Sequence, residues 1–131
     1  MKTYEIEVLP DEPIMITHIL KGYKVNVDMP QSDAEARAIL DQAAEPMFHI
    51  VEASERLISL DDIISAANIG ARGEQALWHH PMVREMIFVH PAEVVKLAAK
   101  GLKGASFGNL NVKVFDTLDE ALSYARAALK G

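Results

Sequence analysis

The stretch from residue 46 to residue 70, PMFHIVEASERLISLDDIISAANIG, constrains the fold more than any other part of this chain. Its first part, residues 47 to 53, is almost continuously apolar, which is typical of a strand covered on both faces of a sheet. Apolar side chains then recur at the spacing of one buried helix face: Leu60, Ile63, Ile64 and Ala67. The stretch therefore predicts a central strand, a short polar crossing and an amphipathic helix.

The first 45 residues predict a hairpin or meander followed by a helix. Residues 4 to 9 and 14 to 20 are rich in β-branched and aliphatic side chains, and the breaker Pro-Asp-Glu-Pro separates them. Residues 23 to 28 alternate between apolar and polar, which predicts a third strand with one solvated face and an exposed edge. Ser32 and Glu35 have the spacing of a capping box, so we expect the first helix to begin there and to end near residue 45.

The rest of the chain alternates strands with helices. Strands are expected at residues 86 to 89 and 111 to 115. A helix should begin at Pro91, and the spacing of Thr117 and Glu120 predicts a capping box for a last helix. Strands separated by helices usually pair in parallel through right-handed crossovers. We therefore predict an α/β fold, a mixed β-sheet with about four helices, in a single domain spanning residues 1–131.

Composition and charge restrict the classes of function. A chain of 131 residues can bury one core, and the absence of cysteine excludes disulfides and thiolate metal sites. A net charge of −6 without a basic run disfavours nucleic-acid binding. No signal segment is visible at the start, and no apolar stretch approaches the roughly 18–20 residues of a membrane span. We therefore expect a soluble, cytoplasmic protein without stable membrane insertion.

The sequence contains no motif that specifies an enzyme or a cofactor site. A P-loop and a dinucleotide-binding G-x-G-x-x-G are missing, so we expect no cofactor. The pattern G-x-S-x-G occurs at residues 104–108, GASFG, but it follows a predicted helix, whereas a nucleophile elbow lies between a strand and a helix. An enzyme that uses His49 or His90 as a base is an alternative, but no nucleophile or carboxylate is paired with them. The adjacent His79 and His80 have poor spacing for one metal ion, so no metal site is expected. His90 follows a predicted strand, where open α/β sheets bind ligands.

The predicted helix near residue 60 has an acidic entrance. Ser59 and Asp62 have capping-box spacing, and Asp61 and Asp62 lie where the helix dipole favours negative charge. Capping is one interpretation of these side chains, and binding is the other. Trp78 belongs to a predicted short turn of helix over residues 74–80. It is either a partly buried anchor or part of a partner-binding surface.

Residues 45–130 resemble the STAS superfamily, in particular the small bacterial SpoIIAA-like proteins that are similar to anti-sigma-factor antagonists. The resemblance rests on the strand MFHIVEAS, the helix SLDDIISAANIG, the segment ALWHHPMVREMIFVHPAEVVKLAAKGL and the ending VKVFDTLDEALSYARAAL. It implies a non-catalytic domain of sheet and helices. In anti-sigma-factor antagonists a serine at the start of the helix after the central strand is phosphorylated. The usual D-S-S-G pattern is absent here, since Leu60 and Asp61 occupy the serine pair and Ser59 falls one place earlier.

The resemblance implies two kinds of function. The first is a regulatory or scaffold domain that binds an unidentified protein partner, with Asp61 as a fixed negative charge or Ser59 as an altered phosphoacceptor. The second is a carrier or sensor of a lipid-like or other apolar small molecule, because SpoIIAA-like proteins are similar in fold to certain lipid-binding domains. The exposed edge at residues 23 to 28 would offer a homodimer surface. The binding candidates are Ser59, Asp61, Asp62, Trp78 and His90, and the cleft candidates are Met47, Ile63, Ile64, Trp78 and Met82.

Overall fold

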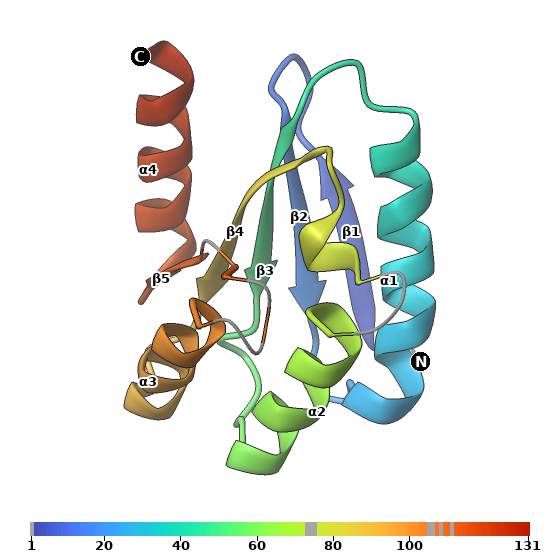
Figure 1. Ribbon diagram of the computed structural model, residues 1–131, viewed down its shortest axis with the longest axis vertical. Helices are drawn as coiled ribbons and strands as arrows, with labels where there is room; N and C mark the ends of the chain where they lie inside the picture. The colour runs from blue at the N-terminus through green and yellow to red at the C-terminus, as the bar shows by residue number, and fades with distance from the viewer. Residues whose placement is uncertain (1, 73–75, 105–106, 108, 111) are drawn as a thin grey trace.

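The computed structural model describes residues 2–72, 76–104, 107, 109–110 and 112–131. Within them, five strands form one sheet: β1 (Tyr4–Val8), β2 (Ile14–Ile19), β3 (Met47–Glu52), β4 (Val83–Val89) and β5 (Val112–Phe115). The strands lie side by side in chain order (Figure 1). β1 runs antiparallel to β2, whereas β2 to β5 are all parallel. The predicted central strand is therefore confirmed as β3, the middle of the sheet.

Helices connect the parallel strands, as the sequence predicts. α1 (Val25–Asp41) joins β2 to β3, and α3 (Glu93–Leu102) joins β4 to β5. α2 (Leu60–Gly70) and a short 3-10 helix, η1 (Leu77–His79), lie between β3 and β4, and α4 (Leu118–Lys130) follows β5. The mixed sheet with four α-helices in the described residues confirms the predicted fold class. Of these helices, none has both the length and the apolar character that a membrane span requires.

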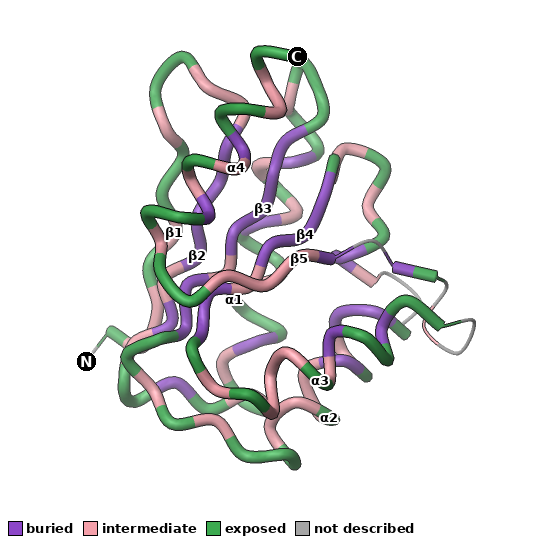
Figure 2. The backbone as a smooth tube through the Cα atoms, turned by 90° about the vertical axis from the view of Figure 1, so that its left-hand side faces the viewer, coloured by how far each residue is buried: buried purple, intermediate pink, exposed green. Residues whose placement is uncertain are grey.

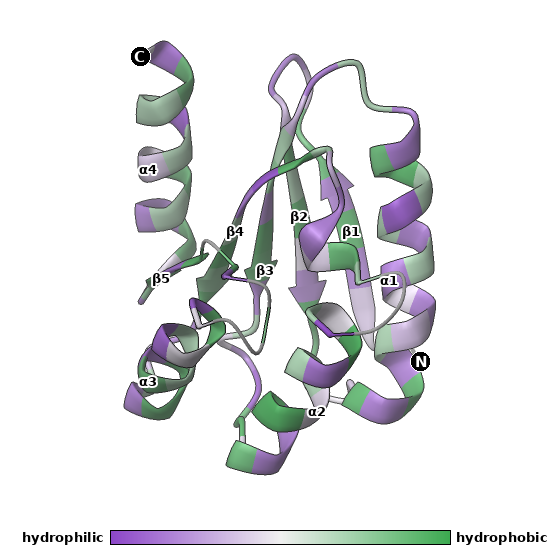
Figure 3. Ribbon diagram, viewed as in Figure 1, coloured by the Kyte–Doolittle hydropathy of each residue, from purple (hydrophilic) through white to green (hydrophobic). Residues whose placement is uncertain are grey.

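Different helices cover the two faces of the sheet. Because side chains alternate along a strand, Met15 and Met47 belong to the core under α1, α2, η1 and α3, whereas Ile16 and Ile50 pack under α4. Figure 2 shows β3 and β4 buried along most of their length, and Figure 3 shows hydrophobic residues concentrated on these strands. The protein thus has three layers, with the sheet in the middle.

The start of α1 differs from the sequence expectation. Residues 23–28 do not form a strand, because the Asp28 carboxylate accepts the Lys24 N–H at 2.7 Å and α1 begins within this stretch. Ser32 is no N-cap, since it lies buried inside α1 and its hydroxyl donates to the Met29 carbonyl oxygen at 3.2 Å. The edge predicted for dimerisation is therefore wrong: in the described part of the sheet, the edge strands are β1 and β5.

A helical period explains why α1 forms at this position. Four buried side chains recur three or four residues apart and face the sheet: Met29, Ser32, Ala36 and Leu40. The apolar and polar alternation at residues 23 to 28 covers too few positions to outweigh this longer pattern. Val27 is accordingly 68% exposed, whereas Tyr23 is buried. The helix therefore starts seven residues before the predicted serine.

Both predicted capping boxes that precede later helices are confirmed. The Ser59 side chain accepts the Asp62 N–H at 3.1 Å, and the Asp62 carboxylate accepts the Ser59 N–H at the same distance. Thr117 and Glu120 make the equivalent pair of bonds at 3.2 Å before α4. Local sequence therefore defines both helix starts.

Other boundaries differ by a few residues. α3 begins at Glu93, after an Ala92 N-cap, so Pro91 is not its first residue. α1 ends at Asp41 rather than near residue 45, and β4 begins three residues earlier than predicted. Of the turn predicted over residues 74–80, η1 covers the last part, and residues 74 and 75 lie outside the described residues. Residue 111, predicted to start the last strand, also lies outside them.

Candidate ligand-binding cavity

An apolar cavity of about 130 Å³ lies between the sheet and helices α1, α2 and α3. Aliphatic and aromatic side chains make up most of its wall, among them Met29, Val89 and Leu102. It adjoins the carboxyl ends of β2, β3 and β4, where open α/β sheets commonly bind ligands. Its position and lining are those of a small-molecule site.

The cavity exists because small side chains face it from two neighbouring helices. α2 contributes Ala66 and Ala67, and α3 contributes Ala98 and Ala99. α2 and α3 also contact one another. Alanine side chains do not reach far enough to fill the space that remains.

Trp78 closes one wall of the cavity. Its side chain is only 6% exposed, and its ring meets the Phe88 ring edge to face at 5.0 Å between centroids. It also packs on the backbone of α2, because a Cβ atom at Gly70 would come within 2.7 Å of its ring. Gly70 is therefore required for this close approach. Trp78 is therefore buried, as expected of an anchor, and its contact with a partner stays a prediction.

A buried polar pair lies in the cavity wall. Nε2 of His49 on β3 lies 2.9 Å from the Thr17 hydroxyl oxygen on β2. His49 is 2% exposed, and among the described residues its Nδ1 has no hydrogen-bond partner. Burial lowers the pKa of His49 to about 4, so the imidazole is neutral at pH 7. The pair therefore has one ring nitrogen without a hydrogen-bond partner among the described residues.

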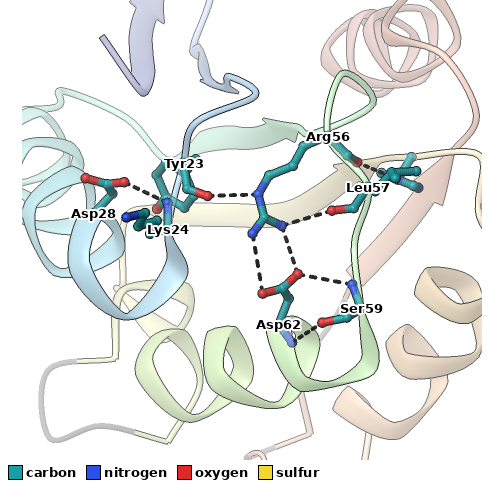
Figure 4. Close-up of polar contacts among 8 residues, drawn as sticks. Tyr23, Lys24, Asp28, Arg56, Leu57, Ser59 and Asp62 are labelled. Carbon is teal, nitrogen blue, oxygen red and sulfur yellow. Dashed lines mark hydrogen bonds and ion pairs between the residues drawn. The ribbon is translucent and has the colours of Figure 1, made fainter. Parts of the chain in front are cut away.

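Arg56 lines the cavity and makes hydrogen bonds to several segments of the chain (Figure 4). Its Nε donates to the Tyr23 carbonyl oxygen at 2.8 Å, and another guanidinium nitrogen donates to Asp62 at 2.9 Å and to the Leu57 carbonyl oxygen at 3.1 Å. The hydrogen bond from Arg56, together with bonds from Ser59, lowers the pKa of Asp62. Arg56 therefore ties the loop before α2 to the segment before α1.

A second polar group lies where α1 meets the cavity. The Tyr23 hydroxyl and the Ser32 hydroxyl are hydrogen-bonded at 2.9 Å. Asp33 also lines the cavity, and burial raises its pKa to about 7, although nearby Arg37 acts to lower it. This carboxyl is therefore partly protonated at neutral pH.

His90 lines the cavity with both ring nitrogens engaged. Nε2 donates to the Arg56 carbonyl oxygen at 2.9 Å, and Nδ1 accepts the Ala92 N–H at 3.0 Å. This arrangement fits a neutral imidazole that fixes the junction between β4 and α3. His90 can contact a ligand through its ring face, but it has no nitrogen left for a proton transfer.

The predicted site residues separate into two groups. Asp62, Trp78 and His90 lie on the cavity wall, whereas Ser59 and Asp61 are exposed at the start of α2. Of the five predicted cleft residues, Ile63 and Trp78 line the cavity. The other three do not line it: Met47 and Met82 pack in the core, and Ile64 is 52% exposed.

Sequence reasoning missed Thr17, Asp33 and Arg56 as cavity residues. The signal available for Thr17 was a polar side chain inside an apolar strand, which also marked His49. Arg56 carried no such signal, because its partner Tyr23 is 33 residues away and contributes a backbone carbonyl. His79 and His80 bond to different partners. Nε2 of His79 lies 2.6 Å from the Phe107 carbonyl oxygen, and Nε2 of His80 lies 2.8 Å from the Asp41 carboxylate, so the two rings do not point at one common position.

Comparison with solved structures establishes the fold. The chain is similar to the crystal structure of an uncharacterized protein of the DUF3478 family with a SpoIIAA-like fold from Shewanella loihica. The TM-score is 0.56 at 16% identity, over 93% of this chain and 91% of that chain. This protein therefore has a SpoIIAA-like fold, as its sequence resemblance predicts. No family model and no curated protein matches the sequence.

Proposed function

We propose that this protein binds a small apolar molecule in the cavity under α1, α2 and α3, as a carrier or sensor and not as an enzyme. The observation that carries the proposal is the apolar cavity itself, at the carboxyl ends of the parallel strands. Packed interiors of this size seldom leave so large a space. The cavity is partly open to solvent, which gives a ligand a route into it.

Cavity size limits the ligand. A volume of about 130 Å³ is close to that of an engineered apolar cavity of about 150 Å³ that binds benzene. A ligand with one ring or a short alkyl chain therefore fits, and a diacyl lipid would need a much larger opening. We accordingly narrow the lipid-like ligand to a molecule of about seven non-hydrogen atoms, for which the ceiling of about 1.5 kcal/mol per atom permits useful affinity.

Trp78 allows a direct test, because it is the single tryptophan of the chain and lines the cavity. Titration with toluene should change its fluorescence with saturation, and should shift the NMR signals of cavity residues but not those of the α4 face. Native mass spectrometry of freshly purified protein should show a bound small molecule. Ligand-free spectra together with no response to toluene up to its solubility would refute the proposal.

The exposed start of α2 supports a second candidate function, contact with a protein partner. Leu57 is 93% exposed, and Leu60 and Ile64, one helical turn apart, are 59% and 52% exposed. They surround Ser59 and Asp61, the predicted contact residues. Isolated exposed leucines are ordinary, but several in one place are typical of an interaction surface.

A matched pair of variants tests this second function. Leu60→Glu with Ile64→Glu should abolish capture of a cognate partner from extracts of the source cell, because both changes put charge into an apolar contact. Val27→Glu is the control, since Val27 is 68% exposed on another helix. Equal capture by the two variants would count against a partner surface on α2. Ser59 as a phosphoacceptor stays a prediction.

A further inference from the structure

We infer that the ligand carries one neutral hydrogen-bonding group, such as a hydroxyl, and that this group bonds to Nδ1 of His49. The inference rests on the proposed function and adds the chemical class of the ligand. It assigns His49 and Thr17 as the residues that distinguish a polar ligand from a purely apolar one of the same size.

The geometry of the His49 and Thr17 pair supports a polar contact inside the cavity. The two side chains come from adjacent parallel strands, and they are 2% and 5% exposed. Nε2 of His49 is satisfied by the Thr17 hydroxyl at 2.9 Å, whereas Nδ1 has no partner in the part of the chain that the structure describes. Buried polar atoms are almost always hydrogen-bonded, and the His49 residue lines the cavity, so we expect a ligand beside this ring to supply the missing partner.

A hydroxyl fits both tautomers of the imidazole. If the Thr17 hydroxyl donates to Nε2, Nδ1 carries the proton and seeks an acceptor; if Nε2 donates to Thr17, Nδ1 is an acceptor and seeks a donor. A ligand hydroxyl can play either part. A carbonyl fits only the first arrangement, so the broadest match is an alcohol or a phenol.

Charged groups are disfavoured at this position. Burial keeps the His49 imidazole neutral by lowering its pKa, so it supplies no positive charge for a carboxylate. Arg56 lines the cavity, and its guanidinium already donates to Asp62 and to two carbonyl oxygens. Asp33 lines the cavity as well, but its own carboxyl is partly protonated by burial. Burying an ion here would lose hydration without full compensation.

Four probes of similar size test the inference: toluene, phenol, benzoate and benzylamine. Their dissociation constants are measured by NMR titration at pH 7 on the wild-type protein and on the double variant Thr17→Val with His49→Phe, which removes both polar partners at once. His18→Phe is the control, because His18 bonds to Glu7 on β1 and does not line the cavity. The ratio of the toluene constant to the phenol constant should fall about fivefold in the double variant, the effect of one net hydrogen bond. It should not change in the control.

A measurement on the wild-type protein covers the case in which the double variant does not fold. The side-chain nitrogen shifts of His49 report its tautomer and hydrogen bonding, and phenol should move the Nδ1 signal while toluene does not. An unchanged Nδ1 signal, an unchanged ratio in a folded double variant, or tighter binding of benzoate or benzylamine than of phenol would overturn the inference. In those cases toluene binding still supports the proposed function, whereas absence of binding by all four probes would overturn both.

Discussion

Filling the cavity with a larger side chain should make the protein more stable. The cavity has a volume of about 130 Å³, which leaves room for three more carbon atoms. Ala67 on α2 is 5% exposed and lines this space. Ala67→Leu adds three carbon atoms, whose burial contributes up to about 2 kcal/mol, and ordering the leucine side chain costs about 1 kcal/mol. We expect the free energy of unfolding to rise by about 1 kcal/mol.

The same substitution on the other face of the sheet should have the opposite effect. Ala121 on α4 is fully buried and packs against close neighbours such as Phe48 and Ile87. Ala121→Leu therefore overpacks the core, and the free energy of unfolding should fall by about 1–3 kcal/mol. The intrinsic helix propensities of the two residues are the same in both variants, so the difference isolates the cavity.

Urea denaturation followed by far-ultraviolet circular dichroism measures both changes through the midpoint and the slope. Toluene titration of the folded Ala67→Leu variant should show no saturable response, because the leucine occupies the ligand's space. The reasoning is refuted if Ala67→Leu destabilises the protein as much as Ala121→Leu, since the space would then not accept three carbon atoms. It is also refuted if the filled variant binds toluene as the wild type does.

Three further changes test the contacts around the cavity. Gly70→Ala should lower the free energy of unfolding by about 1–3 kcal/mol, because the added Cβ clashes with the tryptophan ring. Gly101→Ala has open space around its Cβ and should raise the free energy of unfolding by up to about 1 kcal/mol. Chemical denaturation measures both changes. Arg56→Met should lower it by about 2 kcal/mol, because a guanidinium with three hydrogen-bond partners is lost. His49 has a native pKa of about 4, below its ordinary 6.5, so its contribution to stability falls as pH decreases through this window. Asp33 has a native pKa of about 7, above its ordinary 3.8, so its contribution falls as pH increases. Asp33→Asn removes this decrease, so the free energy of unfolding of the variant should rise more steeply from pH 4.5 to 6.5 than that of the wild type. The two slopes should differ by up to about 1.4 kcal/mol per pH unit. Urea titrations at several pH values measure these slopes.

Each of these expectations has a control. If Gly70→Ala and Gly101→Ala shift stability in the same direction, the close packing on α2 is not what Gly70 provides. Arg126→Met removes an exposed ion pair with Glu12 and should change stability little. An effect equal to that of Arg56→Met would contradict the stabilising role of the Arg56 hydrogen bonds. Parallel pH profiles for wild type and Asp33→Asn would contradict the burial of that carboxyl.

Much of the fold could be predicted from sequence, because its signals are local. The apolar run that became β3 and the capping boxes at Ser59 and Thr117 depend on residues within a few positions of each other. Alternation of strands and helices then leaves few topologies open, and the parallel order from β2 to β5 follows. The misplaced strand at residues 23 to 28 shows the limit of such signals. A short alternating run has the same pattern in a strand and in the first turns of a helix, and the longer helical period decided the outcome.

The candidate site depends on contacts that no local pattern contains. Sequence marks His49 as a polar residue in an apolar strand, but only the packed structure places it beside Thr17, 32 residues earlier, with one ring nitrogen unpaired. The cavity likewise arises where alanines of α2 and α3 face the same space. The same alanine side chain fills the space next to it where two elements pack closely, and leaves a cavity where they lie farther apart. The distance between the elements therefore decides which occurs. Sequence therefore determined the layers of this protein, and tertiary packing decided that a cavity remains between the sheet and the helices on one face.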